Sequence, residues 1–555
     1  MPINSLVLKA LQLFRPPFGT VSLILLTSLW LAGVGNVALW HALWNMPEIT
    51  GWSGAGFLLA FFGFVAALHA AFLSLFAWRW TFKPVLVFCL VAAALGANFM
   101  LTYGVVIDRT MMVNVLQTDV RESKELLSLQ LVMILGLMAT LPAIWLWRLE
   151  LKQRSLWLQL RGNLLTFFGA VILAVVVVML SFQSMASMMR NHKQLRFMIN
   201  PLNSVYALSE IALEPFARPK KPMIAIGQDA RPGATWQKSG KPPLFVLVVG
   251  ETARAANFSL NGYARETNPE LATENVASFL NVYSCGTSTA ASVPCMFSHL
   301  GREAYDKRDA DYQALLDVLD HAGVAVLWRD NNAGCKGTCG NIQNEDLSHA
   351  TNPKFCTSQE CFDEVMLHQL DERLAKLTNG DAHKGIVVVL HQKGSHGPAY
   401  YIRSPKAYKK FMPECETNAL QSCTREQVTN AYDNTILYTD HFLAQTVAWL
   451  KTRADHYDTA MLYVSDHGES LGENNTYLHG LPYMIAPDVQ KHVPMVLWLS
   501  PQMEQRRGLN TACMQGQRNA ALSHDNLFHS VLGLLDIQTD VYRADRDMFK
   551  ACVGK

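Results

Sequence analysis

Five stretches of apolar residues dominate the first third of the chain. They cover residues 18–40, 55–78, 84–106, 129–147 and 164–182, and each is rich in Leu, Val, Phe and Ala and nearly free of charge. A helix needs about 20 such residues to cross the hydrocarbon core of a bilayer. Five uncharged stretches in series are typical of membrane insertion rather than of buried helices in a soluble protein. We therefore expect residues 1–185 to form a transmembrane domain of five helices.

The basic residues give this domain an orientation. Residues 1–185 contain 11 Lys or Arg, and eight of them lie in the N-terminal segment and in the loops after the second and fourth stretches. Because cytoplasmic loops carry the excess of Lys and Arg, we expect a cytoplasmic N-terminus and an exported C-terminal half. No small-residue cleavage site follows the first stretch, so we expect that stretch to remain as an anchor.

The pattern changes after residue 185. Residues 186–240 mix apolar residues with cations and then become polar, which predicts a helix lying on the membrane surface followed by a linker. From residue 241 onwards, short strand-like runs alternate with amphipathic helical patterns. This alternation predicts an α/β domain with a largely parallel sheet over residues 241–555. The expected strands are 244–250, 324–328, 386–390, 461–465 and 495–499, and the expected helices include 312–321, 362–377 and 425–451.

The overall composition excludes two classes of protein. Hydrophobic residues make up 50% of the chain and charged residues only 17%, which argues against a wholly soluble protein. Lys and Arg number 47 against 45 Asp and Glu, for a net charge of +2. A dedicated nucleic-acid binder usually carries a strong basic excess, so we expect no nucleic-acid partner.

Cysteine placement supports export of the second half. Cys89 lies inside the third apolar stretch and is expected to be a free buried thiol, whereas the other ten of the 11 cysteines follow residue 241. An even number on one side of the membrane predicts disulfides in an oxidising compartment. The short spacings suggest the pairs 285–295, 335–339, 356–361 and 415–423, which leaves 513–552. The alternative is a structural zinc site built from the cysteines at 335, 339, 356 and 361.

Acidic residues and histidines follow three of the predicted strands. Glu251 ends the first strand, His391 ends the third with His396 in the next loop, and Asp466 and His467 end the fourth. In open α/β sheets, ligands bind at the carboxyl ends of the strands. Carboxylates and imidazoles together suit zinc, and less well manganese. The sequence therefore predicts a metal site at this edge of the sheet.

A segment rich in hydroxyl groups is the candidate source of a nucleophile. Thr287, Ser288, Thr289 and Ser292 lie within six residues, inside the expected disulfide loop 285–295. Such residues are also ordinary helix caps, and a hydroxyl needs a base or a metal to become a good nucleophile. The residues alone do not choose among the four. The chain contains no Gly-rich nucleotide-binding motif, so nucleotide chemistry is unsupported.

A polar stripe follows the third apolar stretch. Asn114, Thr118 and Glu122 are spaced i, i+4 and i+8 and would share one face of a helix. The stripe lies on the exported side, where a phospholipid headgroup would sit. The alternative is an ordinary solvated helix face.

Three motifs together resemble the lipid A phosphoethanolamine transferases, a family that includes the mobile colistin-resistance enzymes. The motifs are ETARAANFSLNGY from Glu251, CGTSTAASVPCMFS from Cys285 and SDHGESLGE from Ser465. The resemblance covers the whole chain. It implies an alkaline-phosphatase/sulfatase-like α/β domain behind five transmembrane helices.

The resemblance also implies roles for individual residues. Zinc would be held by Glu251, Thr289, Asp466 and His467, with Thr289 as the nucleophile. His396 and His479 would lie near the phosphoryl group or a second zinc, and either one could serve as the catalytic acid or base. Contacts with the phosphoethanolamine are implied for Asn332 and Lys336, and headgroup binding is favoured for the stripe at Asn114, Thr118 and Glu122.

The expected activity is transfer of phosphoethanolamine from phosphatidylethanolamine to lipid A through a phosphothreonine. The protein would be a monomer in the inner membrane of a Gram-negative cell with its catalytic domain in the periplasm, and the reaction would lower surface anionic charge and give polymyxin resistance. Three alternatives remain: a transferase with another glycan acceptor such as lipopolysaccharide core, a membrane-anchored sulfatase or phosphodiesterase, and a non-enzymatic membrane sensor.

Overall fold

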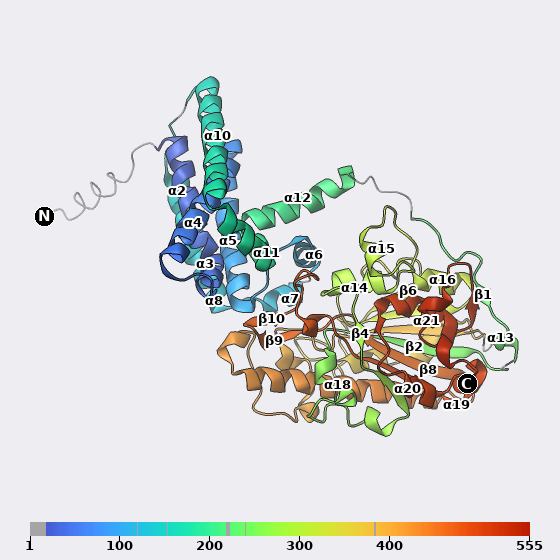
Figure 1. Cartoon of the computed structure of the whole chain (residues 1–555). Helices are drawn as coiled ribbons and strands as arrows, with labels where there is room; N and C mark the ends of the chain where they lie inside the picture. Colours follow the sequence, from blue (N-terminus) through green and yellow to red (C-terminus); the bar gives the residue numbers. More distant parts are fainter. Residues whose placement is uncertain are drawn as a thin grey trace. The chain divides into compact units, whose positions relative to one another are not determined.

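The computed structural model describes residues 18–118, 120–152, 154–217, 223–238, 240–381 and 384–554 (Figure 1). The chain divides into two compact units. The first, called the membrane unit here, comprises residues up to 112 together with 127–214. The second, the α/β unit, comprises 113–126 and 215–555.

Five helical segments of the membrane unit are long and apolar enough to cross a bilayer. They are Thr20–Trp44, Gly51–Leu75 (α4), Phe82–Tyr103 (α5), Leu129–Arg148 and Leu156–Leu180 (α10). On α10, large side chains such as Leu165, Phe168 and Ile172 are exposed, as expected for helices that face lipid. The five predicted spans are therefore confirmed. Two further helices follow them, α11 (Phe182–Asn191) and α12 (Leu202–Ala217).

A seven-stranded sheet forms the centre of the α/β unit (Figure 1). Its strand order is β3-β11-β8-β2-β7-β5-β6. The strands β2, β5, β6, β7 and β8 run parallel, whereas β11 is antiparallel to both of its neighbours. Their bounds are Pro243–Gly250 (β2), Val276–Phe279 (β3), Ala325–Asp330 (β5), Gln343–Asp346 (β6), Ile386–His391 (β7), Asp458–Ser465 (β8) and Met495–Leu499 (β11).

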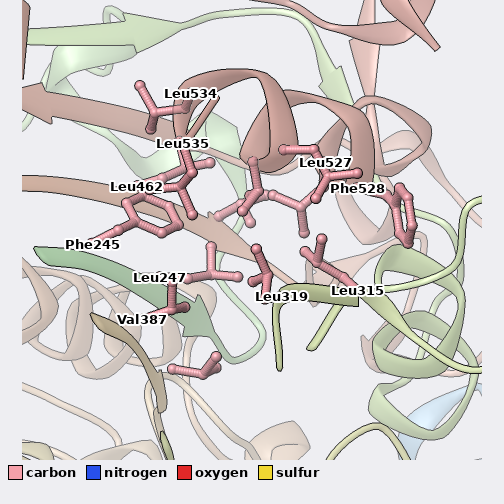
Figure 2. Packing of buried hydrophobic residues seen from close by; sticks show 14 of the residues in the cluster. Phe245, Leu247, Leu315, Leu319, Val387, Leu462, Leu527, Phe528, Leu534 and Leu535 are labelled. Atoms are coloured by element: carbon pink, nitrogen blue, oxygen red, sulfur yellow. The ribbon is translucent and has the colours of Figure 1, made fainter. Parts of the chain in front are cut away.

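Helices cover both faces of this sheet. Alternate residues of β2 point to opposite faces, because the side-chain period of a strand is two. Phe245 and Leu247 pack with α16 (Leu315–His321) and α21 (Leu527–Leu534) on one face, as Figure 2 shows. On the other face, Leu244 and Val246 pack with α17 (Leu370–Leu377) and α18 (Arg425–Lys451). The predicted α/β fold with a largely parallel sheet is confirmed.

Two predicted helices are interrupted in the structure. The prediction of one helix over 362–377 is wrong. Gln369, with a positive φ of 53°, separates the short turn Asp363–Met366 from α17. The helix expected to carry the polar stripe is also divided, into α6 (Arg109–Gln117) and α7 (Val120–Glu125). Thr118 lies between them and donates its hydroxyl to the Asn114 carbonyl over 2.8 Å, a contact that competes with helix geometry.

Part of the polar segment before residue 241 packs on the α/β unit. The strand β1 (Arg231–Pro232) pairs with β13 (Ile537–Gln538), and the short helix α13 (Thr235–Lys238) follows it. Trp236 Nε1 in that helix donates to the Leu535 carbonyl over 2.7 Å. The last residues of the expected linker are therefore ordered against the domain that follows.

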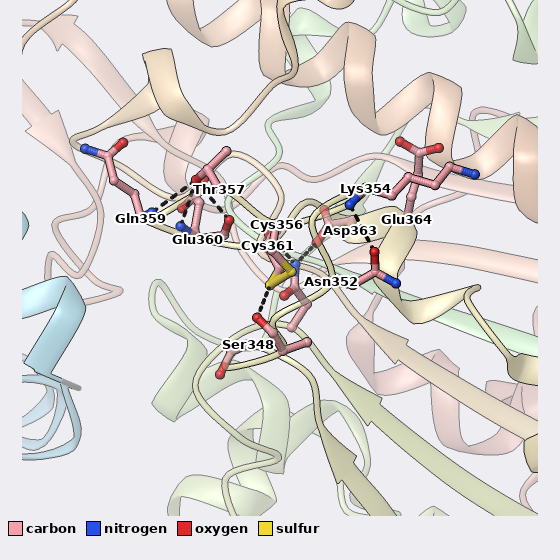
Figure 3. Close-up of a disulfide and its surroundings, with 12 residues drawn as sticks. Ser348, Asn352, Lys354, Cys356, Thr357, Gln359, Glu360, Cys361, Asp363 and Glu364 are labelled. Atoms are coloured by element: carbon pink, nitrogen blue, oxygen red, sulfur yellow. Dashed lines mark hydrogen bonds between the residues drawn. A yellow bond between two sulfur atoms is a disulfide. The ribbon is translucent and has the colours of Figure 1, made fainter.

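All ten cysteines of the α/β unit form disulfides, and the five pairs are those suggested by the spacing: 285–295, 335–339, 356–361, 415–423 and 513–552. Cys89 is free and buried. The pairing prediction is confirmed, and the alternative zinc site is wrong because its four sulfurs are consumed in two disulfides. Figure 3 shows one of them, Cys356–Cys361, closing the tight loop that carries Thr357 and Glu360.

Candidate active site

Two neighbouring strands bring the central acids together. β2 and β8 are parallel and hydrogen-bonded, with Gly250 opposite Ser465 at their carboxyl ends. Glu251 and Asp466 are the next residues on each strand, so the register alone places the two side by side. Both are fully buried, as is His467.

Glu251, Asp466 and His467 form a compact cluster of metal-ligating atoms, which all lie within 4.8 Å of one another. His467 Nε2 lies 3.4 Å from Glu251 Oε1 and 3.3 Å from Asp466 Oδ2. Thr289 joins the cluster: its Oγ1 donates to Glu251 Oε2 over 3.0 Å and lies 3.5 Å from His467 Nε2. The four residues that the resemblance names as zinc ligands therefore converge at one point.

The donor atoms of this cluster fit a metal ion. Asp466 Oδ1 accepts from the backbone N–H groups of Thr252 and His467, whereas Oδ2, although buried, accepts no hydrogen bond from any residue that the structure describes. Such an orphaned carboxylate oxygen is costly unless a cation satisfies it. His467 Nδ1 lies 2.9 Å from the Gly468 carbonyl, which holds the proton on Nδ1 and leaves the Nε2 lone pair for a metal.

The charges of the buried cluster also favour binding of a cation. Burial, reinforced by the charge of Glu251, raises the pKa of Asp466 to about 6. Burial alone would lower the pKa of His467, but the carboxylates of Asp466 and Glu251 outweigh it and raise that pKa to about 10. Burial would raise the pKa of Glu251, but its hydrogen bond to His467 and the nearby imidazoles hold it well below its usual value. Without a metal, a proton on His467 balances the two acids.

Thr289 is the first residue of α14 (Thr289–Met296) and is half-buried. The other hydroxyls of the segment point elsewhere. Thr287 donates to the Leu481 carbonyl over 2.6 Å, and Ser292 accepts the Gly286 N–H over 2.9 Å. Ser288 is buried, and its hydroxyl has no hydrogen-bond partner among the described residues. Among the four candidates, only Thr289 contacts the acidic cluster.

His396 and His479 lie beside this cluster. The ring of His479 is 4.3 Å from that of His467 and 5.7 Å from that of His396, centroid to centroid. His479 Nδ1 lies 3.1 Å from Oε2 of Glu469, a fully buried carboxylate. Glu469 was not predicted as a site residue, although it lies inside the motif that begins at Ser465.

His391 does not join the metal cluster, contrary to the expectation from the strand ends. Its Nδ1 lies 2.8 Å from Asp330 Oδ2, at the end of β5, and its Nε2 lies 3.3 Å from the side-chain nitrogen of Asn332. Asn332 in turn donates to Glu251 Oε2 over 2.6 Å. The side chain that ends β7 therefore stands behind the Glu251 carboxylate and contacts it through Asn332.

The remaining candidate residues lie outside this group of contacts. Lys336 donates its Nζ to the Ala333 carbonyl of its own turn over 2.9 Å. Asn114 and Thr118 belong to the interrupted segment 113–126, and the side chain of Glu122 lies outside the described residues. Their proposed contacts with substrate stay predictions.

Comparisons with known proteins agree with the fold and the site. Residues 243–537 match the Sulfatase family model, and residues 65–215 match the model for phosphoethanolamine transferase EptA/EptB. The phosphoethanolamine transferase EptA of Escherichia coli strain K12 is 42% identical over 86% of this chain and 87% of its own length. The phosphatidylethanolamine transferase Mcr-1 of Escherichia coli is 42% identical over 85% of this chain and 86% of its own length.

A solved structure extends the likeness to both units. The integral membrane protein lipooligosaccharide phosphoethanolamine transferase A (EptA) from Neisseria meningitidis superposes with a TM-score of 0.92 and 36% identity, over 97% of this chain and 100% of its own.

A buried carboxylate–histidine cluster at the carboxyl edge of a sulfatase-like sheet, joined to five transmembrane helices, defines a membrane-bound enzyme of the sulfatase superfamily. Within it, the chain belongs to the phosphoethanolamine transferases of the EptA and Mcr type. The resemblance drawn from the three motifs is confirmed.

Proposed function

We propose that this enzyme transfers phosphoethanolamine from phosphatidylethanolamine to a phosphate of lipid A, through a phosphothreonine on Thr289. The observation that carries the proposal is the position of Thr289 Oγ1, 3.0 Å from Glu251 Oε2 and 3.5 Å from His467 Nε2. The phosphoethanolamine transferases to which the chain is similar supply the transferred group and support a lipooligosaccharide-type acceptor.

Zinc is the metal we assign to the cluster, with Glu251, Asp466, His467 and Thr289 as its ligands. When bound, zinc would favour the ionised form of the threonine hydroxyl and stabilise negative charge that develops on the phosphoryl oxygens. The full burial of three of these ligands excludes water from their side of the site, which strengthens every charge interaction there.

In the first half-reaction, Thr289 Oγ1 passes its hydroxyl proton to Glu251 Oε2, its hydrogen-bond acceptor, and attacks the phosphorus of phosphatidylethanolamine. A bond forms between Oγ1 and phosphorus, the bond to the diacylglycerol oxygen breaks, and that oxygen takes a proton as it leaves. His479 is the residue we assign to this proton transfer, because Glu469 orients its ring from Nδ1 and thus directs Nε2 away from the carboxylate.

In the second half-reaction, an oxygen of the lipid A phosphate attacks the phosphothreonine. The bond between phosphorus and Thr289 Oγ1 breaks, Oγ1 takes its proton back from Glu251, and a proton lost by the acceptor phosphate restores His479. The product carries an added amine on an anionic group, so the outer surface loses net negative charge and attracts cationic polymyxins less strongly. The charge asymmetry of the spans supports a cytoplasmic N-terminus and an exported α/β unit, and we place the enzyme in the inner membrane with that unit in the periplasm.

The covalent intermediate tests this function. The purified full chain is incubated with phosphatidylethanolamine alone, and the adduct is mapped by peptide mass spectrometry. We expect a phosphoethanolamine group on Thr289, its disappearance when lipid A is added, and no adduct on Thr289→Ala. Thr289→Ser should keep part of the activity, and Ser288→Ala serves as the matched control that keeps all of it. An adduct on Ser288 or Ser292, or release of free phosphoethanolamine without acceptor, would contradict the proposal.

A further inference from the structure

A cavity lies in the α/β unit, next to the loops that carry Thr289 and His479. Its volume is about 560 Å³, within the range of sites that bind small molecules. Its polar lining includes Ser284, Arg302, Lys307, Tyr483, Asp525 and Arg546. None of these residues belongs to the metal cluster or to the contacts described around it.

The cations of this cavity are not held in side-chain ion pairs within the described residues. Arg302 lies over the ring of Tyr483, with its guanidinium carbon 3.5 Å from the ring centroid. In the part of the chain that the structure describes, no side-chain ion pair with a carboxylate is formed by Arg302, Lys307 or Arg546. Arg308 shows the contrast: it stacks on a tyrosine too, but its Nε lies 3.4 Å from Asp311.

The stacking on Tyr483 fixes Arg302 without using its hydrogen-bond donors. A guanidinium has five N–H donors in a rigid plane and matches the oxygens of a phosphate well. Because the ring already holds the side chain in place, little entropy is lost when an anion binds. Arg546 is fixed as well, since its Nη1 donates to the Leu300 carbonyl over 2.8 Å.

The cavity also holds acidic and hydroxyl groups. Asp525 Oδ1 accepts the backbone N–H of Arg302 over 2.8 Å, which leaves its other oxygen for further contacts, and Glu303 and Ser523 complete this side of the lining. Cations next to carboxylates suit a ligand that carries both a phosphate and amine or hydroxyl groups. A phosphorylated amino sugar has this combination, whereas an apolar acyl chain does not.

Two loops connect the cavity with the nucleophile. Ser284 stands five positions before Thr289, and Tyr483 stands four positions after His479. The loops are bonded to each other, because the Gly480 N–H donates to the Thr287 carbonyl over 2.7 Å and Thr287 Oγ1 donates to the Leu481 carbonyl over 2.6 Å. Five residues span at most about 18 Å, so this wall of the cavity lies no farther than that from Thr289.

We propose that this cavity binds a phosphorylated amino sugar of the acceptor. Arg302, Lys307 and Arg546 would hold a phosphate group other than the one that receives phosphoethanolamine, and would thereby position the acceptor against the phosphothreonine. The assignment rests on the proposed function for the identity of the acceptor. The charge and volume of the cavity support the class of ligand independently of the proposed function.

The test uses the full chain in detergent, with Arg302→Gln and Lys307→Gln as the variants. Arg308→Gln is the matched control, because it removes a stacked arginine from the same segment outside the cavity. Three quantities are measured: binding of glucosamine 1-phosphate against unphosphorylated glucosamine, formation of the Thr289 adduct from phosphatidylethanolamine alone, and KM for lipid A.

We expect each cavity variant to weaken glucosamine 1-phosphate binding and to raise KM for lipid A by about tenfold, since a hydrogen bond between charged groups is lost. The rate of adduct formation should stay unchanged, and Arg308→Gln should match the parent in all three assays. Binding that is weak in the parent and equal in the variants would overturn the proposal, as would an unchanged KM. Slower adduct formation in the variants would assign the cavity to the donor and overturn it too.

The same assays separate this inference from the proposed function. If the parent forms no adduct while glucosamine 1-phosphate binds in a manner that depends on Arg302, the covalent mechanism fails and the specificity of the cavity stands. If the adduct forms normally and the variants bind and react like the parent, the cavity assignment alone fails.

Discussion

The side-chain nitrogen of Asn332 lies 2.6 Å from Glu251 Oε2, and the other two acceptors near it, the Gln392 carbonyl at 3.0 Å and His391 Nε2 at 3.3 Å, also belong to the protein. Asn332 is also buried. The family resemblance implies that this residue contacts phosphoethanolamine. Its contacts favour a different contribution, in which it fixes the orientation of a metal ligand.

Asn332→Ala should therefore lower the affinity for metal. Loss of a residue that orients a ligand typically costs about 10–100-fold in metal affinity or activity. We expect zinc content after dialysis against a weak chelator to fall, and excess zinc to restore kcat in part. Asn344→Ala, at an exposed position of β6, is the control and should retain its zinc. A higher KM for phosphatidylethanolamine with full zinc content would instead support direct contact with the substrate.

Zinc uptake by the metal-free enzyme should release protons. The pKa of His467 is raised to about 10 and that of Asp466 to about 6, so at pH 7 the metal-free site retains a proton on His467. A ligand must lose its proton to bind zinc, so apparent affinity should rise between pH 5.5 and pH 8. Titration calorimetry in buffers of different ionisation enthalpy measures this release. Zinc affinity that is independent of pH over this range would contradict the assignment.

The folding stability of the metal-free protein should fall as pH rises from 4 to 6, whereas the affinity for zinc should rise with pH. Because the folded-state pKa of Asp466 is above its unfolded value of 3.8, the folded state binds the extra proton between pH 4 and pH 6. This contribution of Asp466 is full below pH 4 and is lost as pH rises through about 6. Thermal unfolding of chelator-treated enzyme, with Asp466→Asn as the comparison, measures it, and the variant should lack this part of the slope.

His479 and Glu469 should act as a pair. The 3.1 Å contact between His479 Nδ1 and Glu469 Oε2 orients the imidazole, and the carboxylate is fully buried. His479→Gln should lower the rate of adduct formation by about 10²–10⁴-fold, the usual contribution of a general acid or base. Glu469→Gln should lower the same rate less, and the double variant should be no slower than His479→Gln. Additive losses would mean that the two residues act separately.

The sequence predicted the parts of this protein that depend on local pattern. Apolar runs and strand periodicity are read from neighbouring residues, so the five spans and the strands β2, β5, β7, β8 and β11 were found. The edge strand β6 was missed because its residues, Gln343–Asp346, are all polar. Pairings across the chain were beyond such reasoning: the place of His391 behind Asn332 follows from the order of strands β7 and β5, which no local pattern encodes.

The disulfides should differ in their contribution to stability. In the chain-entropy account, Cys356–Cys361 closes a loop of about five residues and Cys513–Cys552 one of 39. The expected losses are about 2 kcal/mol for the first and about 4 kcal/mol for the second. Paired Cys→Ser variants, unfolded in urea and followed by tryptophan fluorescence, should show the lower midpoint for the 513–552 pair. The reverse order would mean that local packing outweighs loop closure.

Arg403 connects the segment 113–126 with the loop that carries His396. Its guanidinium binds the carboxylates of Glu360 and Glu125 and donates from Nε to the His396 carbonyl over 2.8 Å. The Arg403 side chain is 1% exposed and that of Glu125 is 17% exposed. Asn418 adds a second contact, from its side-chain nitrogen to the Glu125 carbonyl over 2.6 Å. One buried cation thus orders both the segment of Asn114 and Thr118 and an active-site loop.

Arg403→Ala should loosen both segment 113–126 and the loop of His396. Removing the guanidinium leaves the carboxylates of Glu360 and Glu125 without their cation, at a cost of about 3 kcal/mol. We expect faster hydrogen exchange in residues 113–126 and around His396, together with a higher KM for phosphatidylethanolamine. Glu125→Gln, which keeps the Asn418 contact, should loosen only residues 113–126. The control is Arg425→Gln, because Arg425 is 65% exposed in its pair with Glu473 and such surface pairs contribute little. Unchanged exchange in 113–126 on loss of Arg403 would mean that the segment is held by its other contacts.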